Sequence, residues 1–272
     1  MPIVQSWLDQ TVEETLEPDL PICDPHRHLW DYPDSRYLLA ELLSDTDSGH
    51  NIRSTVFVEC LSNYKKASSA NLAPVGETEF VEKILSDNST KGTAVAAGLV
   101  AHANLMLADS IDEVLWAHRQ ASPERFRGIR HSASWDASDA VRNSHSNSPA
   151  HLYLNKKFRQ GFARLANFDL IFDSWLYHPQ LHELRDLAMT FPYQTIVLDH
   201  AGGPLGIGPY ANKRSEVFAQ WRKSIKALAD CENVVAKLGG LGMAINGFGW
   251  HKEKIPPSSE QLAQVNRPYL EH

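Results

Sequence analysis

The sequence predicts an α/β fold built on a parallel sheet, because short apolar runs alternate regularly with longer helix-like segments. The runs are nearly continuous in apolar residues instead of strictly alternating, which is typical of parallel strands covered on both faces. This rhythm fits either a closed barrel or an open doubly wound sheet. The expected strands are Pro21–Asp24, Ser54–Cys60, Thr93–Ala101, Arg125–His131, Phe168–Trp175, Thr195–His200 and Val234–Leu238.

The segments between these runs carry apolar residues at helical spacing. Leu107, Ile111, Val114 and Leu115 repeat in this way, and Pro179 stands at a typical first helical position. Two polar or Gly-rich loops, 132–149 and 201–212, follow strands at the end where α/β barrels place active sites. The expected helices are Glu77–Asp87, Leu107–Gln120, Pro179–Thr190, Ser215–Ala229 and the segment from Ser258 to the end.

Length and composition predict one domain over residues 1–272, with an extension at 1–20. The formal net charge of −7 and the lack of a basic run argue against nucleic acid as a partner. No secretory signal or long apolar span is present, and three widely spaced cysteines favour a reducing cytoplasm over a disulfide framework. A small-molecule substrate is therefore expected, without a membrane partner, and assembly into a homo-oligomer is left open.

The sharpest local feature is the segment Asp24-Pro25-His26-Arg27-His28 at the end of the first expected strand. Residues two apart on an extended chain point to the same side, so His26 and His28 are placed to share one divalent metal ion. A surface pair without a function is the alternative. His200 ends the sixth expected strand beside Asp199, where a side chain that titrates near neutral pH suits acid–base chemistry. Its alternative is a buried structural histidine.

Two other kinds of site are excluded by their spacing. The stretch Gly202-Gly203-Pro204-Leu205-Gly206 lacks the Gly-x-Gly-x-x-Gly spacing and the Lys-Ser/Thr pair of phosphate loops. Its prolines also remove backbone donors. No Gly-x-Ser-x-Gly element is present, so a serine hydrolase has no support.

The chain resembles the amidohydrolase superfamily, in the branch that holds sugar lactonases, pyrone dicarboxylate lactonase and amino-carboxymuconate decarboxylase. The resemblance rests on five motifs in the same order as in that branch, spanning roughly residues 21 to 240. They are the His-x-His segment, the run Ser54–Cys60 with Glu59, the segment Arg127–His131, the segment Phe172–Gln180, and the segment Leu198–Pro204.

The resemblance implies a TIM-type (β/α)8 barrel and assigns roles to several histidines. His26 and His28 match the metal-binding pair of metal-dependent members, and His178 falls where some members place a further metal ligand. A histidine at the position of His200 binds metal or polarises the substrate carbonyl. Asp173 is a rival contact for substrate or metal.

Arginines near the fourth strand hold substrate carboxylates in related lactonases, which makes Arg127, Arg130 and His131 candidates. Strand alternation places Arg130 on a different face from Arg127, and its position nearer the strand end favours Arg130 as the catalytic residue. Glu59 and Lys237 are weaker candidates inside the second and seventh strands, with Lys237 assigned to substrate binding.

Superfamily members carry an essential aspartate at the end of an eighth strand, but nothing after Leu238 has the pattern of a strand. The expected barrel is therefore truncated before strand eight. The predicted function is hydrolysis of a lactone, or of an amide-like bond, in a small acidic or sugar-derived metabolite. A divalent metal such as zinc is the expected cofactor, and action without a metal is left open. The alternatives are a non-oxidative decarboxylase of the same family and a truncated, inactive barrel.

Overall fold

The computed structural model describes residues 4–66, 69–86, 92–143 and 146–271, which form two compact units. The first unit comprises Glu14–Arg130 and Gln160–Ile171. The second comprises Ile3–Glu13, His131–Arg159 and Phe172–His272. Residue 87 of the expected helix at 77–87 and residues 144–145 of the expected loop at 132–149 lie outside the described residues.

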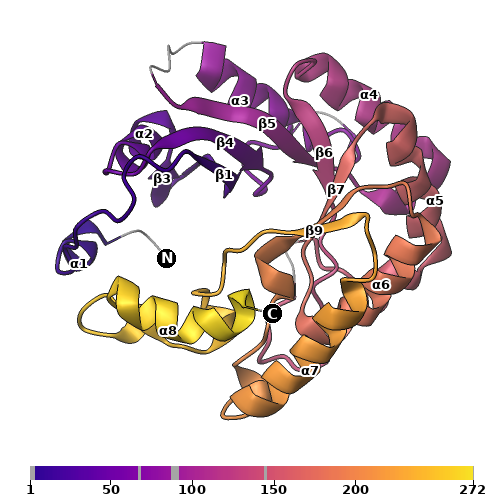
Figure 1. The fold of residues 1–272 in the computed structure, drawn as a ribbon. Coiled ribbons are helices and arrows are strands. Elements are labelled where there is room, and N and C mark those ends of the chain that lie inside the picture. The colour runs from indigo at the N-terminus through magenta and orange to yellow at the C-terminus, as the bar shows by residue number, and fades with distance from the viewer. Residues whose placement is uncertain (1–3, 67–68, 87–91, 144–145, 272) are drawn as a thin grey trace. The chain divides into compact units, whose positions relative to one another are not determined.

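Four parallel strands form the sheet of the first unit, in the order in which they occur in the chain (Figure 1). Most positions in the C-terminal halves of β4, β5 and β6 are buried, which explains the continuous apolar runs of the sequence, whereas β1 is only partly buried. A separate antiparallel hairpin of strands β2 and β3 follows β1. The strands are β1 (Ile22–Arg27), β4 (Ile52–Val58), β5 (Ala94–His102) and β6 (Phe126–Arg130), with the hairpin at β2 (Trp30–Tyr32) and β3 (Ser35–Tyr37).

Helices α3 (Val75–Ser86) and α4 (Ile111–Ala121) connect the strands of the first unit, after the shorter α2 (Leu39–Thr46). Helix α4 buries Ile111, Val114, Leu115 and His118, the stripe that 3.6-residue periodicity gives. One member of this buried stripe, His118, is polar.

The second unit has three parallel strands, again in chain order. Helices α6 and α7 lie side by side within it (Figure 1). Its strands are β7 (Ile171–Ser174), β8 (Ile196–Leu198) and β9 (Val234–Ala236), and its helices are α1 (Gln5–Leu8), α6 (Leu181–Thr190), α7 (Arg214–Leu228) and α8 (Ser259–Leu270). Helix α5 (Lys156–Arg164) runs from residues of the second unit into residues of the first.

The seven predicted strands are confirmed, with shorter bounds at several ends. The expected strand at 168–175 begins only at Ile171, because Asp169 adopts a left-handed backbone conformation (φ 53°) that ends the preceding 3₁₀ turn. Likewise α4 starts at Ile111 and not at Leu107, since Ala108 (φ 53°) interrupts the helical backbone. After β9 the described residues contain no further strand.

Helices α1, α2 and α5 and the hairpin were not predicted from the sequence. In α5 the apolar signal is limited to Phe158 and Phe162, one turn apart and both fully buried, within an otherwise polar segment. None of the helices in the described residues combines the length and the apolar character that a membrane crossing requires.

Gly161 lets helix α5 approach the start of the 3₁₀ turn at Leu105. A Cβ at position 161 would lie 2.1 Å from the Leu105 carbonyl oxygen, a backbone atom that has no rotamer to escape into. We expect Gly161→Ala to destabilise the protein by at least about 2 kcal/mol, although alanine is the better helix former. Urea unfolding measures the change.

The matched control is Gly242→Ala, because a Cβ there would meet nothing within 4 Å. It should change the free energy of unfolding by no more than about 0.5 kcal/mol. Equal effects at the two positions would contradict the close approach of α5.

Candidate functional site

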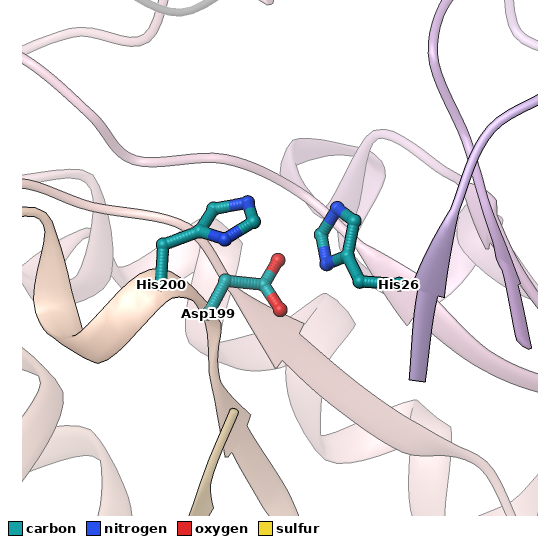
Figure 2. Close-up of side chains that lie close together, drawn as sticks. All are labelled: His26, Asp199 and His200. Atoms are coloured by element: carbon teal, nitrogen blue, oxygen red, sulfur yellow. The ribbon is translucent and has the colours of Figure 1, made fainter. Parts of the chain in front are cut away.

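His26 and His28 lie at the C-terminal end of β1, as the sequence predicts. The imidazole of His26 extends from the strand (Figure 2), and the two rings pack edge to face with their centroids 4.9 Å apart. The i, i+2 spacing therefore places both rings together, as extended backbone geometry requires.

The tautomer of His28 is fixed by a backbone carbonyl. Its Nδ1 lies 2.7 Å from the oxygen of Val58, which accepts only, so Nδ1 carries the proton and Nε2 keeps its lone pair. Burial, together with the nearby charges of Arg130 and His26, lowers the pKa of His28 to about 3. The ring is neutral at physiological pH, the form in which histidine binds metals.

The Arg130 guanidinium lies beside these histidines in the first unit. Its Nε donates to Glu59 Oε1 at 2.8 Å, a second nitrogen donates to the Glu59 backbone oxygen, and Nη1 lies 3.3 Å from Nε2 of His26. Because the guanidinium has no acceptor, His26 accepts this bond through an unprotonated Nε2. Arg130 and Glu59 are both buried, so each charge depends on the other. Glu59, a weaker candidate from the sequence, is thus the partner of the favoured arginine.

Arg127 and His131 take different positions from Arg130. Arg127 is exposed and its guanidinium donates to the backbone oxygen of Phe126. His131 is buried and its ring packs 5.5 Å from that of Phe158. The substrate-binding roles of both residues stay predictions.

The loop after β4 is held by a buried acid that the sequence did not single out. Glu77 in α3 accepts hydrogen bonds from the backbone N–H groups of Cys60 and Ser62, at 2.9 and 2.7 Å. Burial, and then the charge of Glu59, raise the pKa of Glu77 to about 8. In the sequence Glu77 has only the pattern of a residue in the first turn of a helix.

In the second unit, Lys237 links two buried carboxylates at adjacent strand ends. Its Nζ lies 2.5 Å from Asp173 Oδ2 and 3.1 Å from Asp199 Oδ1. All three side chains are almost fully buried, where an unpaired charge is costly. The sequence predicted Asp173 and Lys237 as site residues but not Asp199, whose only signal was its place beside His200.

His200 follows Asp199 in the turn after β8, and the two side chains leave the chain at successive positions (Figure 2). The His200 ring packs edge to face on Trp175, with centroids 4.9 Å apart. Gly240 provides the space for it, since a Cβ at this position, where φ is +75°, would lie 2.2 Å from His200 Nδ1. His200 thus remains half-buried at a strand end, as expected.

His178 has an environment that does not suit a metal ligand. It is fully buried, its Nδ1 accepts from the Leu205 N–H at 3.3 Å, and its ring lies 5.2 Å from that of Tyr210. Burial lowers its pKa to about 4, so the ring is neutral and the proton sits on Nε2. A protonated nitrogen offers no lone pair. His28 therefore keeps a lone pair on Nε2, whereas His178, predicted as a third ligand, has none to offer in this hydrogen-bonded state.

Residues 23–268 match the model of the amidohydrolase family. The chain belongs to this family. The uncharacterized protein y4mH of Sinorhizobium fredii is 31% identical over 257 residues, which cover 89% of this chain and 80% of that protein. An L-fucono-1,5-lactonase of Burkholderia multivorans is 31% identical over 84 residues, covering 31% of this chain and 28% of the lactonase.

Two crystal structures of an amidohydrolase from Burkholderia multivorans share the fold. The structure with bound HEPES superposes with a TM-score of 0.65 at 20% identity, and the one with bound zinc with a TM-score of 0.64 at 21% identity. Each comparison covers 92% of this chain and 78% of the other. The expected amidohydrolase barrel fold is thereby confirmed.

The buried pair of Glu59 and Arg130 gives a direct stability prediction. Glu59→Gln keeps the shape of the side chain but removes the negative charge that pairs with the buried Arg130 guanidinium. We expect a loss of about 3 kcal/mol in the free energy of unfolding, measured by urea titration.

Glu79→Gln is the control, because Glu79 pairs with Lys65 on the surface at 2.6 Å with both side chains well exposed. It should cost less than about 1 kcal/mol. If Glu59→Gln costs no more than this control, the pair does not hold the strand ends in the way described.

Proposed function

We propose that this amidohydrolase hydrolyses the ester bond of a lactone in a small acidic or sugar-derived metabolite. The observation that carries the proposal is the buried Arg130 guanidinium, held by Glu59 beside the neutral imidazole of His26 at a strand end. The similarity of 84 residues to an L-fucono-1,5-lactonase supports a lactone as the substrate class.

In each unit, ionisable residues stand at strand ends, where barrel enzymes carry their reacting groups. In (β/α)8 barrels the reacting groups lie at the C-terminal ends of the strands. The first unit carries His26 and Arg130 at such ends, and the second carries Asp173 and Lys237 with His200 just beyond β8. Buried charges of this kind are costly for stability alone, which favours a functional reason for their presence.

The proposed reaction adds water to the lactone carbonyl and breaks the ring C–O bond, giving a hydroxy acid. Arg130 donates hydrogen bonds to the carbonyl oxygen, on which negative charge develops. His200 takes a proton from the attacking water and returns it to the departing ring oxygen, so that protons balance over the cycle. Lys237, oriented by Asp173 and Asp199, binds an anionic or hydroxyl group of the substrate.

Of the three predicted metal ligands, His28 fits a divalent cation in its present hydrogen-bonded state. Nε2 of His28 keeps its lone pair while Nδ1–H donates to a carbonyl, the arrangement by which proteins orient metal-binding histidines. His26 would join it by releasing the hydrogen bond that its Nε2 accepts from Arg130. A divalent ion such as zinc, when bound, supplies a Lewis acid and lowers the pKa of water.

Activity is tested with a panel of sugar-acid 1,4- and 1,5-lactones and carboxylated lactones, following acid release. We expect turnover of at least one, and a loss of at least about a hundredfold in kcat/KM for His200→Asn, since general acid–base catalysis contributes that much. His182→Asn is the matched control, because His182 is exposed on α6 and bonds only locally to the Pro179 oxygen. No acid release from any lactone, or release of carbon dioxide instead, would contradict the proposal.

Metal binding is tested separately by elemental analysis of the purified protein. We expect a stoichiometric divalent metal in the wild type, and at least tenfold weaker zinc binding for His28→Asn, which removes Nε2. His178→Asn should retain the wild-type metal content because His178 is not a ligand. An active protein without metal would refute this part of the proposal and leave the Arg130 chemistry standing.

A further inference from the structure

A line of hydrogen bonds runs through the first unit from helix α3 to the end of β6, and none of its first three members belongs to the site described above. It begins at Thr78, which is buried in α3. Its hydroxyl lies 2.8 Å from Nδ1 of His118 in α4. The described contacts then continue through His102 to Arg130.

The direction of each bond follows from the partners. His118 Nε2 lies 3.1 Å from the backbone oxygen of His102, which accepts only, so Nε2 carries the proton. Nδ1 is then the acceptor, and the Thr78 hydroxyl donates to it. Burial lowers the pKa of His118 to about 4, which agrees with a neutral ring.

His102 repeats the same arrangement one strand further on. It is the last residue of β5, and its Nδ1 lies 3.1 Å from the backbone oxygen of Arg130, the residue opposite it in the parallel register. Nδ1 of His102 is therefore the donor. Two strand-end carbonyls, those of His102 and Arg130, thus accept from imidazoles.

These bonds bear on where the Arg130 side chain points. A carbonyl at the end of a strand needs a donor when it is buried, and leaving it without one costs about 1 to 3 kcal/mol. An imidazole donor at each carbonyl fixes the peptide planes of β5 and β6 at the level from which the Arg130 side chain leaves the backbone. The guanidinium then meets Glu59 and His26.

His118 is an unusual choice for this position if packing were its only role. It occupies the apolar stripe of α4 and is fully buried, with its ring stacked on Phe126 at 5.4 Å. A leucine or phenylalanine would fill such a position without the cost of burying two ring nitrogens. The polar ring is accounted for by its two hydrogen bonds.

We propose that Thr78, His118 and His102 are positioning residues for Arg130. Their hydrogen bonds hold the backbone carbonyls at the ends of β5 and β6 in place, and with them the point at which the Arg130 side chain leaves the backbone. Their effect on catalysis rests on the proposed lactone hydrolysis, whereas their effect on the geometry of Arg130 does not. The two are therefore measured separately.

The geometric part is tested by NMR of the full chain with ¹⁵N-labelled histidine and arginine. We expect the Nε2–H tautomer for His118, the Nδ1–H tautomer for His102, and an Arg130 Nε–H resonance protected from exchange. In His118→Phe, which keeps an aromatic ring beside Phe126 but removes both bonds, the His102 and Arg130 resonances should shift and lose protection. Unchanged resonances in a folded His118→Phe protein would overturn the proposal.

Conservative variants separate positioning from loss of folding. His118→Gln retains an N–H donor for the His102 carbonyl, and Thr78→Ser retains the hydroxyl, so both should keep the wild-type Arg130 resonance. Thr78→Val removes only the first hydrogen bond, and it provides a milder test should His118→Phe fail to fold. A Thr78→Val protein indistinguishable from Thr78→Ser in the His118 resonances would also overturn the proposal.

The catalytic part is tested by kinetics with any lactone that the wild type hydrolyses. We expect His118→Phe to lower kcat/KM by at least about tenfold, as is usual for residues that orient a reacting group, and His118→Gln to stay within about threefold. His182→Phe is the matched control on an exposed helix face and should keep wild-type kinetics. Shifted resonances without activity in the wild type would reject the hydrolase and keep the positioning role, whereas equal kinetics of the Phe and Gln variants would reject the catalytic consequence.

Discussion

The buried ion pair between Arg130 and Glu59 is the constraint on which the first unit of this amidohydrolase depends. Both charges lie out of water, where an unmatched charge is costly, and their pairing ties the end of β4 to the end of β6. The remaining polar groups near them follow the same requirement. His26 accepts from the guanidinium, and Glu77 fixes the loop that begins just after Glu59.

Hydrogen bonds with the backbone determine which ring nitrogen of each of these histidines carries the proton. His28, His102 and His118 each donate one ring N–H to a carbonyl, which leaves the other nitrogen as an acceptor. His178 shows the opposite case, because a backbone N–H donates to its Nδ1 and places the proton on Nε2. The residue type is the same throughout, yet His28 and His102 keep the lone pair on Nε2, whereas His118 and His178 carry the proton there.

Much of the site could be predicted because strand ends are visible in the sequence. His26, Arg130, Lys237 and His200 all stand where an apolar run stops, and within each unit the parallel strands bring such positions to one edge. Residues that act from helices could not be found in this way. Glu77 and His118 lie within helical patterns, where an acid in the first turn or a single histidine in an apolar stripe carries no distinguishing spacing.

The sequence by itself determined the alternation of strands and helices and the strand-end positions that carry ionisable groups, because burial on both faces of a parallel sheet requires continuous apolar runs. The order of five motifs indicated the family. The tertiary structure alone decided which charge meets which partner. Glu59 pairs with Arg130, Asp199 joins Asp173 at Lys237, and His178 packs beside an apolar cluster. Such pairings depend on contacts between residues far apart in the chain, and periodicity along the chain holds no information about them.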